Sequence, residues 1–234
     1  MRGVFIDDIE KDLKNKSGDY LHSAVKAAMS AIPLVGGSAS EIVSMLISSP
    51  ISIRRDKWLI KLSKGIDELK TRMPEFDIES LNDNEVFITT VLHASQAAIR
   101  NHQEEKLIAL RNAVLNSAVG ISIDESILLI FLSLIDTLTP WHLRILKLFQ
   151  DPNNWSIDNG VSFYNLGSLS DLVESAFNEL RGKRSFYDVV VKDLNNQGLL
   201  GTASLHGMMT GSGVMAPRTT EFGNLLFSYT SFPY

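Results

Sequence analysis

A run of very low charge, from residue 27 to residue 53, is the feature that most restricts how this chain folds, since Glu41 is its only formally charged residue. Pro33, a pair of adjacent glycines and Pro50 divide the run into short pieces, and none reaches the roughly 20 apolar residues of a transmembrane helix. Alanine, serine and glycine are abundant here, so helices in this run can pack closely. We therefore expect an apolar Gly/Ala-rich hairpin at 27–53.

A basic amphipathic helix is predicted directly after the hairpin, at 54–73. Residues 54–72 contain seven basic and three acidic residues, a local net charge of +4. Trp58, Leu62 and Leu69 fall on one helical stripe, with lysines beside it, and Pro74 ends the pattern. The stripe predicts that this helix packs one face against the rest of the protein.

Two interpretations of the segment 27–73 stay open. In the first, the apolar run inserts into a membrane and the basic helix holds an anionic leaflet, at about 1 kcal/mol for each Lys or Arg near the surface. In the second, the hairpin packs inside the protein and the lysines form a solvated face. The candidate membrane-contacting residues are Ile32, Leu34, Val35, Ile42, Val43, Leu46, Arg54, Arg55, Lys57, Trp58 and Lys61.

Further helices are predicted up to residue 137. A helical period runs from Asn82, whose spacing to Glu85 suits a capping box, to about Ala118, with a break at 100–103. A short apolar helix follows at 124–138, with the length of a core helix rather than a membrane span. These patterns predict a helical N-terminal domain at 1–137.

The remaining chain, 138–234, resembles a winged-helix domain in the order of its elements. Helices are predicted at 140–150, 170–180 and 185–197, the first with Thr139 as N-cap and Pro140 at its start. Two strands at 199–218 with a glycine-rich tip, and a closing helix after Thr220, complete the order. We expect a mainly α protein whose C-terminal domain is winged-helix-like, with a small β-hairpin.

In winged-helix proteins that read DNA, the third helix enters the major groove. The candidate DNA-contacting residues in this reading are Arg181, Lys183, Arg184, Tyr187, Lys192 and Asn195. Residues 139–234 carry seven basic and eight acidic groups, however, and the hairpin tip at 207–213 has no Lys or Arg. A domain for protein contacts or self-association is therefore favoured, and DNA binding is kept as the alternative.

Residues suited to catalysis do not converge in the sequence. The chain has no cysteine, and its five histidines are scattered; His93 and His102 would lie on opposite sides of a helix. The glycine-rich segments lack the Lys-Ser/Thr of a phosphate-binding loop. We expect no enzyme, no cofactor, no metal and no small-molecule substrate.

The overall composition is that of a folded globular protein, and its net charge of −5 opposes broad capture of nucleic acid. The first twenty residues lack the apolar core of a signal peptide. The expectation is a cytoplasmic protein, peripheral to the inner membrane if the apolar run contacts lipid.

The layout of the whole chain resembles the bacterial abortive-infection alpha family. Four segments occur in the same order: the apolar run 27–53, the basic helix 54–73, the helix 105–117, and the winged-helix-like tail that opens at Leu138 and ends at Thr220-Glu221-Phe222-Gly223. The resemblance implies an antiviral effector or accessory protein that acts without catalysis, through protein contacts and membrane association. The alternative is a winged-helix transcriptional regulator.

Overall fold

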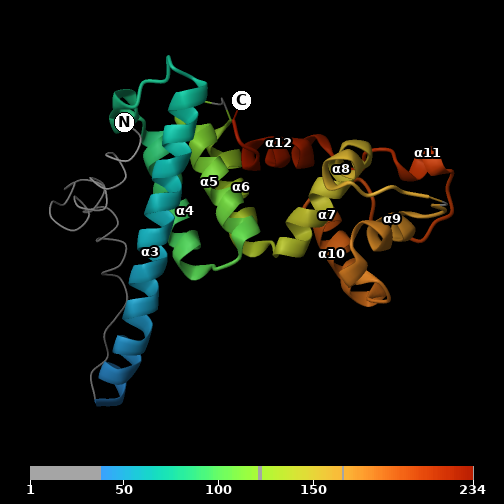
Figure 1. Cartoon of the computed structure of the whole chain (residues 1–234), viewed down its shortest axis with the longest axis horizontal. Coiled ribbons are helices and arrows are strands. Elements are labelled where there is room, and N and C mark those ends of the chain that lie inside the picture. Colours follow the sequence, from blue (N-terminus) through green and yellow to red (C-terminus); the bar gives the residue numbers. More distant parts are fainter. Residues whose placement is uncertain (1–37, 121–122, 165, 234) are drawn as a thin grey trace.

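The computed structural model describes residues 38–120, 123–164 and 166–233, and this part of the chain is mainly α-helical, as predicted (Figure 1). The N-terminal elements are α3 (Ser38–Arg72), the 3-10 helix η1 (Glu79–Asp83), α4 (Glu85–Arg100), α5 (Glu104–Ala118) and α6 (Glu125–Thr137). The C-terminal elements are α7 (Pro140–Gln150), α8 (Pro152–Asn159), α9 (Leu169–Ala176), η2 (Asn178–Leu180), α10 (Arg184–Asn196), α11 (Gly211–Val214) and α12 (Glu221–Thr230).

Helices α3, α4, α5 and α6 pack together and form one half of the molecule (Figure 1). Helix α5 is the innermost of them, with Leu110, Ala113 and Leu115 fully buried. A Cβ atom at Gly65 of α3 would lie 3.1 Å from a methyl carbon of Leu115, so the glycine lets α3 approach α5 closely. The core of this half therefore forms around α5.

Helix α3 runs without interruption from Ser38 through Pro50 to Arg72. Two predictions are therefore wrong from residue 38 onward. The helix does not break at Pro50, and no boundary separates a hairpin at 27–53 from a basic helix at 54–73. A proline inside a helix removes one backbone hydrogen bond and crowds the preceding turn, yet α3 continues through Pro50. One long helix replaces the second arm of the hairpin and the basic helix.

The start of α4 lies two residues after the predicted capping box. Asn84, not Asn82, is the N-cap, and its side-chain oxygen accepts a hydrogen bond from the backbone N–H of Phe87 at 2.9 Å. The predicted break near residues 100–103 is confirmed, because α4 ends at Arg100 and α5 begins at Glu104.

In the C-terminal half, the predicted start of α7 is confirmed. Pro140 is its first residue, and the backbone N–H of Thr139 donates to Nδ1 of His142 at 3.2 Å in a reciprocal cap. The next segment forms α8, and the side chain of Asp151 caps it by accepting a hydrogen bond from the backbone N–H of Asn154 at 3.0 Å. The Asp-Pro step that begins α8 is the same kind of start signal as the Thr-Pro step of α7.

The predicted β-hairpin at 199–218 is not found among the described residues. Its two segments meet at a single antiparallel bridge between Leu200 and Thr219. The loop between them turns inward, since Leu205 and Val214 are buried, and it contains the short helix α11. This loop is rich in glycine and methionine and lacks the alternation of β-branched residues that sustains a strand pair.

The closing helix α12 is confirmed, and it joins the two halves by packing against both α5 and α7 (Figure 1). Thr220 caps it by accepting the N–H of Gly223 at 2.9 Å. A Cβ atom at Gly223 would lie only 2.1 Å from the carbonyl oxygen of Leu199, so only glycine lets α12 cross the chain at this point. The last helix of the predicted C-terminal domain is thus part of the packing of the N-terminal one.

Candidate functional site

The N-terminal part of α3 extends past the ends of α4 and α5 (Figure 1). Residues 42–53 of this helix include no charged residue, and the side chain of Ile53 is 51% exposed. Three of the predicted membrane-contacting residues, Ile42, Val43 and Leu46, belong to this projecting segment. Three others, Ile32, Leu34 and Val35, lie outside the described residues. The part of α3 that projects from the bundle is therefore uncharged from residue 42 to residue 53, with Glu41 as the charged residue before it.

The candidate cations lie on α3 where it meets the bundle. They are Arg54, Arg55, Lys57 and Lys61. Arg55 forms an ion pair with Asp56 at 3.1 Å, and Lys61 pairs with Glu104 of α5. Arg54 and Lys57 are exposed and form no ion pair within the described part of the chain. Two uncompensated cations thus flank the base of the projecting segment.

Trp58 is not exposed for membrane contact in this fold, contrary to its place among the candidates. Its side chain is 2% exposed, and its indole Nε1–H donates to Oγ of Ser95 on α4 at 2.9 Å. The predicted stripe is confirmed, because Leu62 and Leu69 are buried on the same face. Trp58 therefore packs α3 against α4 and stabilises its attachment to the bundle.

The DNA-contact candidates divide into an exposed and an engaged group. The exposed ones are Arg181, Lys183, Arg184 and Lys192. Two of these also have partners: Arg181 donates to the carbonyl of Glu174 at 3.3 Å, and Arg184 lies 3.6 Å from the carboxylate of Asp188. The side-chain amide of Asn195 donates to the carbonyl of Leu200 at 2.8 Å. Tyr187 is buried, and its hydroxyl donates to Glu174 at 2.9 Å; burial, with this hydrogen bond, raises the pKa of Tyr187 to about 12. Tyr187 therefore cannot lie on the outward face of α10 as predicted.

Helix α10 is rotated relative to the prediction. Its buried face consists of Tyr187, Val190, Val191 and Leu194, an i, i+3, i+4, i+7 set. Phe186 and Val189 are instead 42% and 57% exposed. A stripe through Phe186 and Val189 would also be apolar. Tyr187 is buried instead, because its hydroxyl donates to Glu174 on α9.

The histidines of the C-terminal half form separate carboxylate pairs. Nε2 of His206 lies 2.8 and 3.0 Å from the two carboxylate oxygens of Asp188. Nε2 of His142 lies 3.6 Å from Asp193, and burial lowers the pKa of His142 against the opposing effect of this carboxylate. Within the described ranges, no group of three or more His, Asp or Glu residues is placed to hold a metal ion. These pairs join α10 to its neighbours.

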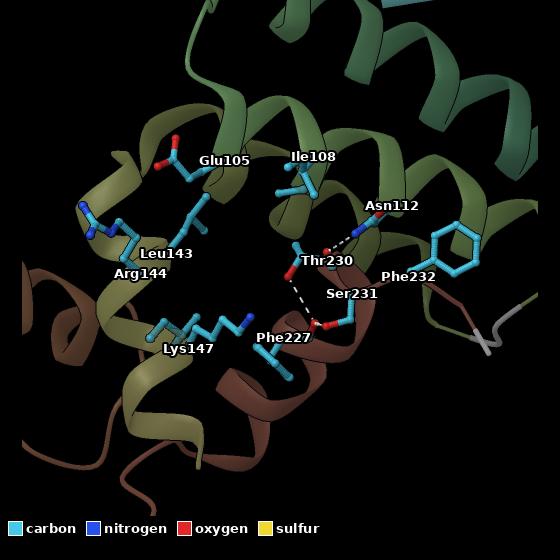
Figure 2. Close-up of a pocket in the computed structure, with 12 residues that line it drawn as sticks. Glu105, Ile108, Asn112, Leu143, Arg144, Lys147, Phe227, Thr230, Ser231 and Phe232 are labelled. Atoms are coloured by element: carbon cyan, nitrogen blue, oxygen red, sulfur yellow. Dashed lines mark hydrogen bonds between the residues drawn. The ribbon is translucent and has the colours of Figure 1, made fainter. Parts of the chain in front are cut away.

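A pocket of about 370 Å³ lies between α5, α7 and α12, where the two halves of the molecule meet (Figure 2). Sequence reasoning did not predict it, because its walls come from three segments far apart in the chain. Its lining residues are Glu105, Ile108, Ala109, Asn112, Leu143, Arg144, Leu146, Lys147, Phe227, Thr230, Ser231 and Phe232. The walls are mostly apolar, and the charged groups lie toward the α7 end (Figure 2).

Among the described helices, none alone is long and apolar enough to span a membrane. Helices α6 and α7 together reach the required length and apolarity, but they are bent by 119° at their junction.

The chain was compared with protein-family models, with curated proteins and with solved structures, and no match was found in any of the three comparisons.

Proposed function

We propose that this protein is a non-enzymatic bacterial docking protein that attaches to anionic membrane surfaces through the projecting part of α3. The observation that supports this function is the continuity of α3. An uncharged segment at 42–53 extends beyond the bundle, and it passes directly into the cationic stretch that begins at Arg54. Apolar residues followed by Arg and Lys are the order that a helix needs when its end enters a membrane and its charges stay at the interface.

The length of the projecting segment suits one leaflet. Residues 42–53 correspond to about 18 Å of helix at about 1.5 Å per residue. One leaflet contributes about half of the roughly 30 Å hydrocarbon thickness. The segment is therefore long enough to enter one leaflet and too short to cross both.

The charges at the base of the segment favour anionic lipid. Arg54 and Lys57 are exposed and free of ion pairs within the described part of the chain, whereas Arg55 and Lys61 are paired with carboxylates. Each cation near an anionic leaflet contributes about 1 kcal/mol, so Arg54 and Lys57 together add about 2 kcal/mol. The attraction falls as salt rises, because the charges are exposed.

Vesicle flotation tests this function. The wild-type protein should float with vesicles of phosphatidylcholine and phosphatidylglycerol, and more weakly with phosphatidylcholine alone. The double change Val43→Lys/Ile47→Lys should abolish flotation, since it places two charges one turn apart in the inserted segment. The matched control is Ile157→Lys/Tyr164→Lys, which adds the same charge at side chains that are 77% and 78% exposed elsewhere.

The neutralised variant Arg54→Gln/Lys57→Gln should float less well with phosphatidylglycerol and lose most of its salt dependence. Failure of the wild type to bind these vesicles contradicts the proposal. Light scattering gives a second test. If the wild type forms a dimer that Val43→Lys/Ile47→Lys loses while flotation is unchanged, α3 is a self-association surface and the proposal is contradicted.

A role in phage defence is proposed on the order of segments that resembles the abortive-infection alpha family. The plating efficiency of phage on cells expressing the wild type, compared with Val43→Lys/Ile47→Lys, tests it. Fewer plaques on wild-type cells than on cells without the protein, with the difference lost in the variant, supports the role. Equal plating on wild-type cells and on cells without the protein contradicts it.

DNA binding by a winged-helix-like C-terminal domain is the second candidate. The observation that favours it is the exposure of Arg181, Lys183, Arg184 and Lys192 around α10. Retardation of duplex DNA at low salt should weaken in Arg184→Gln/Lys192→Gln, with a log–log salt slope near −0.9 for each phosphate contacted. No retardation of DNA by the wild type at low salt contradicts this function.

A further inference from the structure

The pocket between α5, α7 and α12 has the size and shape of a site for a small elongated molecule. Its volume of about 370 Å³ falls within the roughly 300–1,000 Å³ of small-molecule sites. On α5 it extends from Glu105 to Asn112, about 10 Å at about 1.5 Å per residue. Ile108, Leu143 and Phe227 supply apolar wall between these limits (Figure 2).

The uncharged polar groups of the wall are already engaged within the protein. The side-chain amide of Asn112 donates to the carbonyl of Thr230 at 2.8 Å. The hydroxyls of Thr230 and Ser231 donate to carbonyls of the preceding turn of α12, at 2.9 Å to Leu226 and 2.8 Å to Phe227. These groups have little hydrogen-bonding capacity left for a ligand. The charged residues are therefore the ones that can recognise it.

Two of the three charged residues at the pocket are directed away from it. The carboxylate of Glu105 and the guanidinium of Arg144 both point away from α12 (Figure 2). The guanidinium of Arg144 lies 4.1 Å from the ring centre of Trp141 and donates to Glu179 at 3.3 Å. Neither group is aimed at a molecule inside the pocket.

Lys147 is the exception. Its ammonium group extends from α7 toward Phe227 and Thr230 of α12 (Figure 2). The residue is exposed, and its ammonium group has no hydrogen bond or ion pair within the described part of the chain. An unpaired cation at the end of an apolar-walled pocket is complementary to an anionic head group joined to an apolar chain.

We propose that this pocket binds a small amphipathic carboxylate, with the carboxylate on Lys147 and the chain along Ile108 and Phe227. The inference is independent of membrane docking by α3. Because the walls come from both halves of the molecule, such a ligand also holds α5, α7 and α12 together.

Octanoate is the probe, and isothermal titration calorimetry is the measurement. Octanoate should bind saturably at one site, and octan-1-ol, which has the same chain without the charge, should bind more weakly. Lys147→Met keeps most of the apolar stem and removes the charge, so it should weaken octanoate binding at least about tenfold and leave octan-1-ol unaffected. The matched control Lys192→Met removes an exposed lysine outside the pocket and should leave octanoate binding unchanged.

A second variant and a position-specific readout complete the test. Ile108→Asp puts a carboxylate into the apolar wall at a partly exposed position, so it should abolish octanoate binding in a folded protein. In ¹H–¹⁵N spectra, octanoate should shift the Asn112 side-chain amide and the Thr230 amide. Val43→Lys/Ile47→Lys should bind octanoate like the wild type, which separates this site from α3. The proposal is overturned if octanoate does not saturate, or binds Lys147→Met as tightly as the wild type.

Discussion

The side-chain amide of Asn116 on α5 donates to the backbone carbonyl of Tyr229 on α12 at 2.8 Å, across a separation of 113 residues. The same amide lies 2.8 Å from the carbonyl of Ser231, and Asn112 one turn earlier on α5 donates to the carbonyl of Thr230. The last carbonyls of a helix have no partner inside the helix. Two asparagines of α5 therefore donate hydrogen bonds to the carbonyls at the end of α12, and these bonds attach the C-terminal half to the bundle.

Replacing Asn116 by alanine should destabilise the protein by about 1–3 kcal/mol, because it leaves buried carbonyls at the end of α12 without a donor. Asn116 is 1% exposed, so water cannot easily replace its amide. Urea denaturation measures the effect. Asn196→Ala, at an exposed position on α10, is the control and should change the free energy of unfolding by less than about 0.5 kcal/mol. Equal stability of Asn116→Ala and the wild type would contradict the structural role.

Gly223→Ala should cost about 3 kcal/mol or prevent folding of the C-terminal half. The added methyl group would lie 2.1 Å from the carbonyl oxygen of Leu199, and a backbone atom cannot move aside as the end of a side chain can. The control is Gly207→Ala, whose Cβ meets nothing within 4 Å. Thermal unfolding followed by circular dichroism compares the two; similar melting temperatures would show that α12 does not cross Leu199 as described.

The hydrogen bond between Trp58 and Ser95 should appear as a coupling of about 1 kcal/mol in a double-mutant cycle. Trp58→Phe and Ser95→Ala each break the same bond, so the double variant should lose less stability than the two single variants added together. The control cycle pairs Ser95→Ala with Trp155→Phe, since Trp155 lies on α8 in the other half, and should be additive. Additivity in the first cycle would mean that the indole N–H of Trp58 does not donate to Ser95.

Alkaline pH should weaken the packing of α10 through Tyr187. Its pKa is raised from about 10 to about 12 in the folded protein, chiefly by burial and also by its hydrogen bond to Glu174. Between these pH values the folded state holds a proton that the unfolded state has released, so the stability contributed by the neutral phenol is complete below about pH 10 and is lost as pH rises toward about 12.

The difference in unfolding free energy between the wild type and Tyr187→Phe isolates this effect from the titration of lysines. The difference should shrink from pH 9 to pH 11. A constant difference over this range would contradict the raised pKa.

The elements that the sequence predicted well are those with strong local signals. The Thr-Pro start of α7 and the Thr220 cap of α12 depend on hydrogen bonds within one helical turn, and such bonds are encoded by adjacent residues. The apolar stripe of Trp58, Leu62 and Leu69 was also predicted correctly, since its period is a property of the helix alone.

The errors arose where the local pattern was ambiguous or weak. On α10, two stripes of apolar residues compete, and the acceptor on Glu174 decides that Tyr187 faces inward. At 199–218 the order of the elements suggested strands, but the loop lacks the β-branched alternation of a strand pair. Leu205 and Val214 are buried in the core, and only one β-bridge forms.

The order of amino acids alone specifies a mainly helical chain and an uncharged segment at 42–53 followed by cations, because composition and helical period are local properties. Long-range packing, by contrast, makes this segment project from the bundle, buries Trp58, and lets α5, α7 and α12 enclose a pocket with Lys147 at one end. These features depend on residues as far apart as Asn116 and Tyr229, and no local pattern records which distant surfaces will meet.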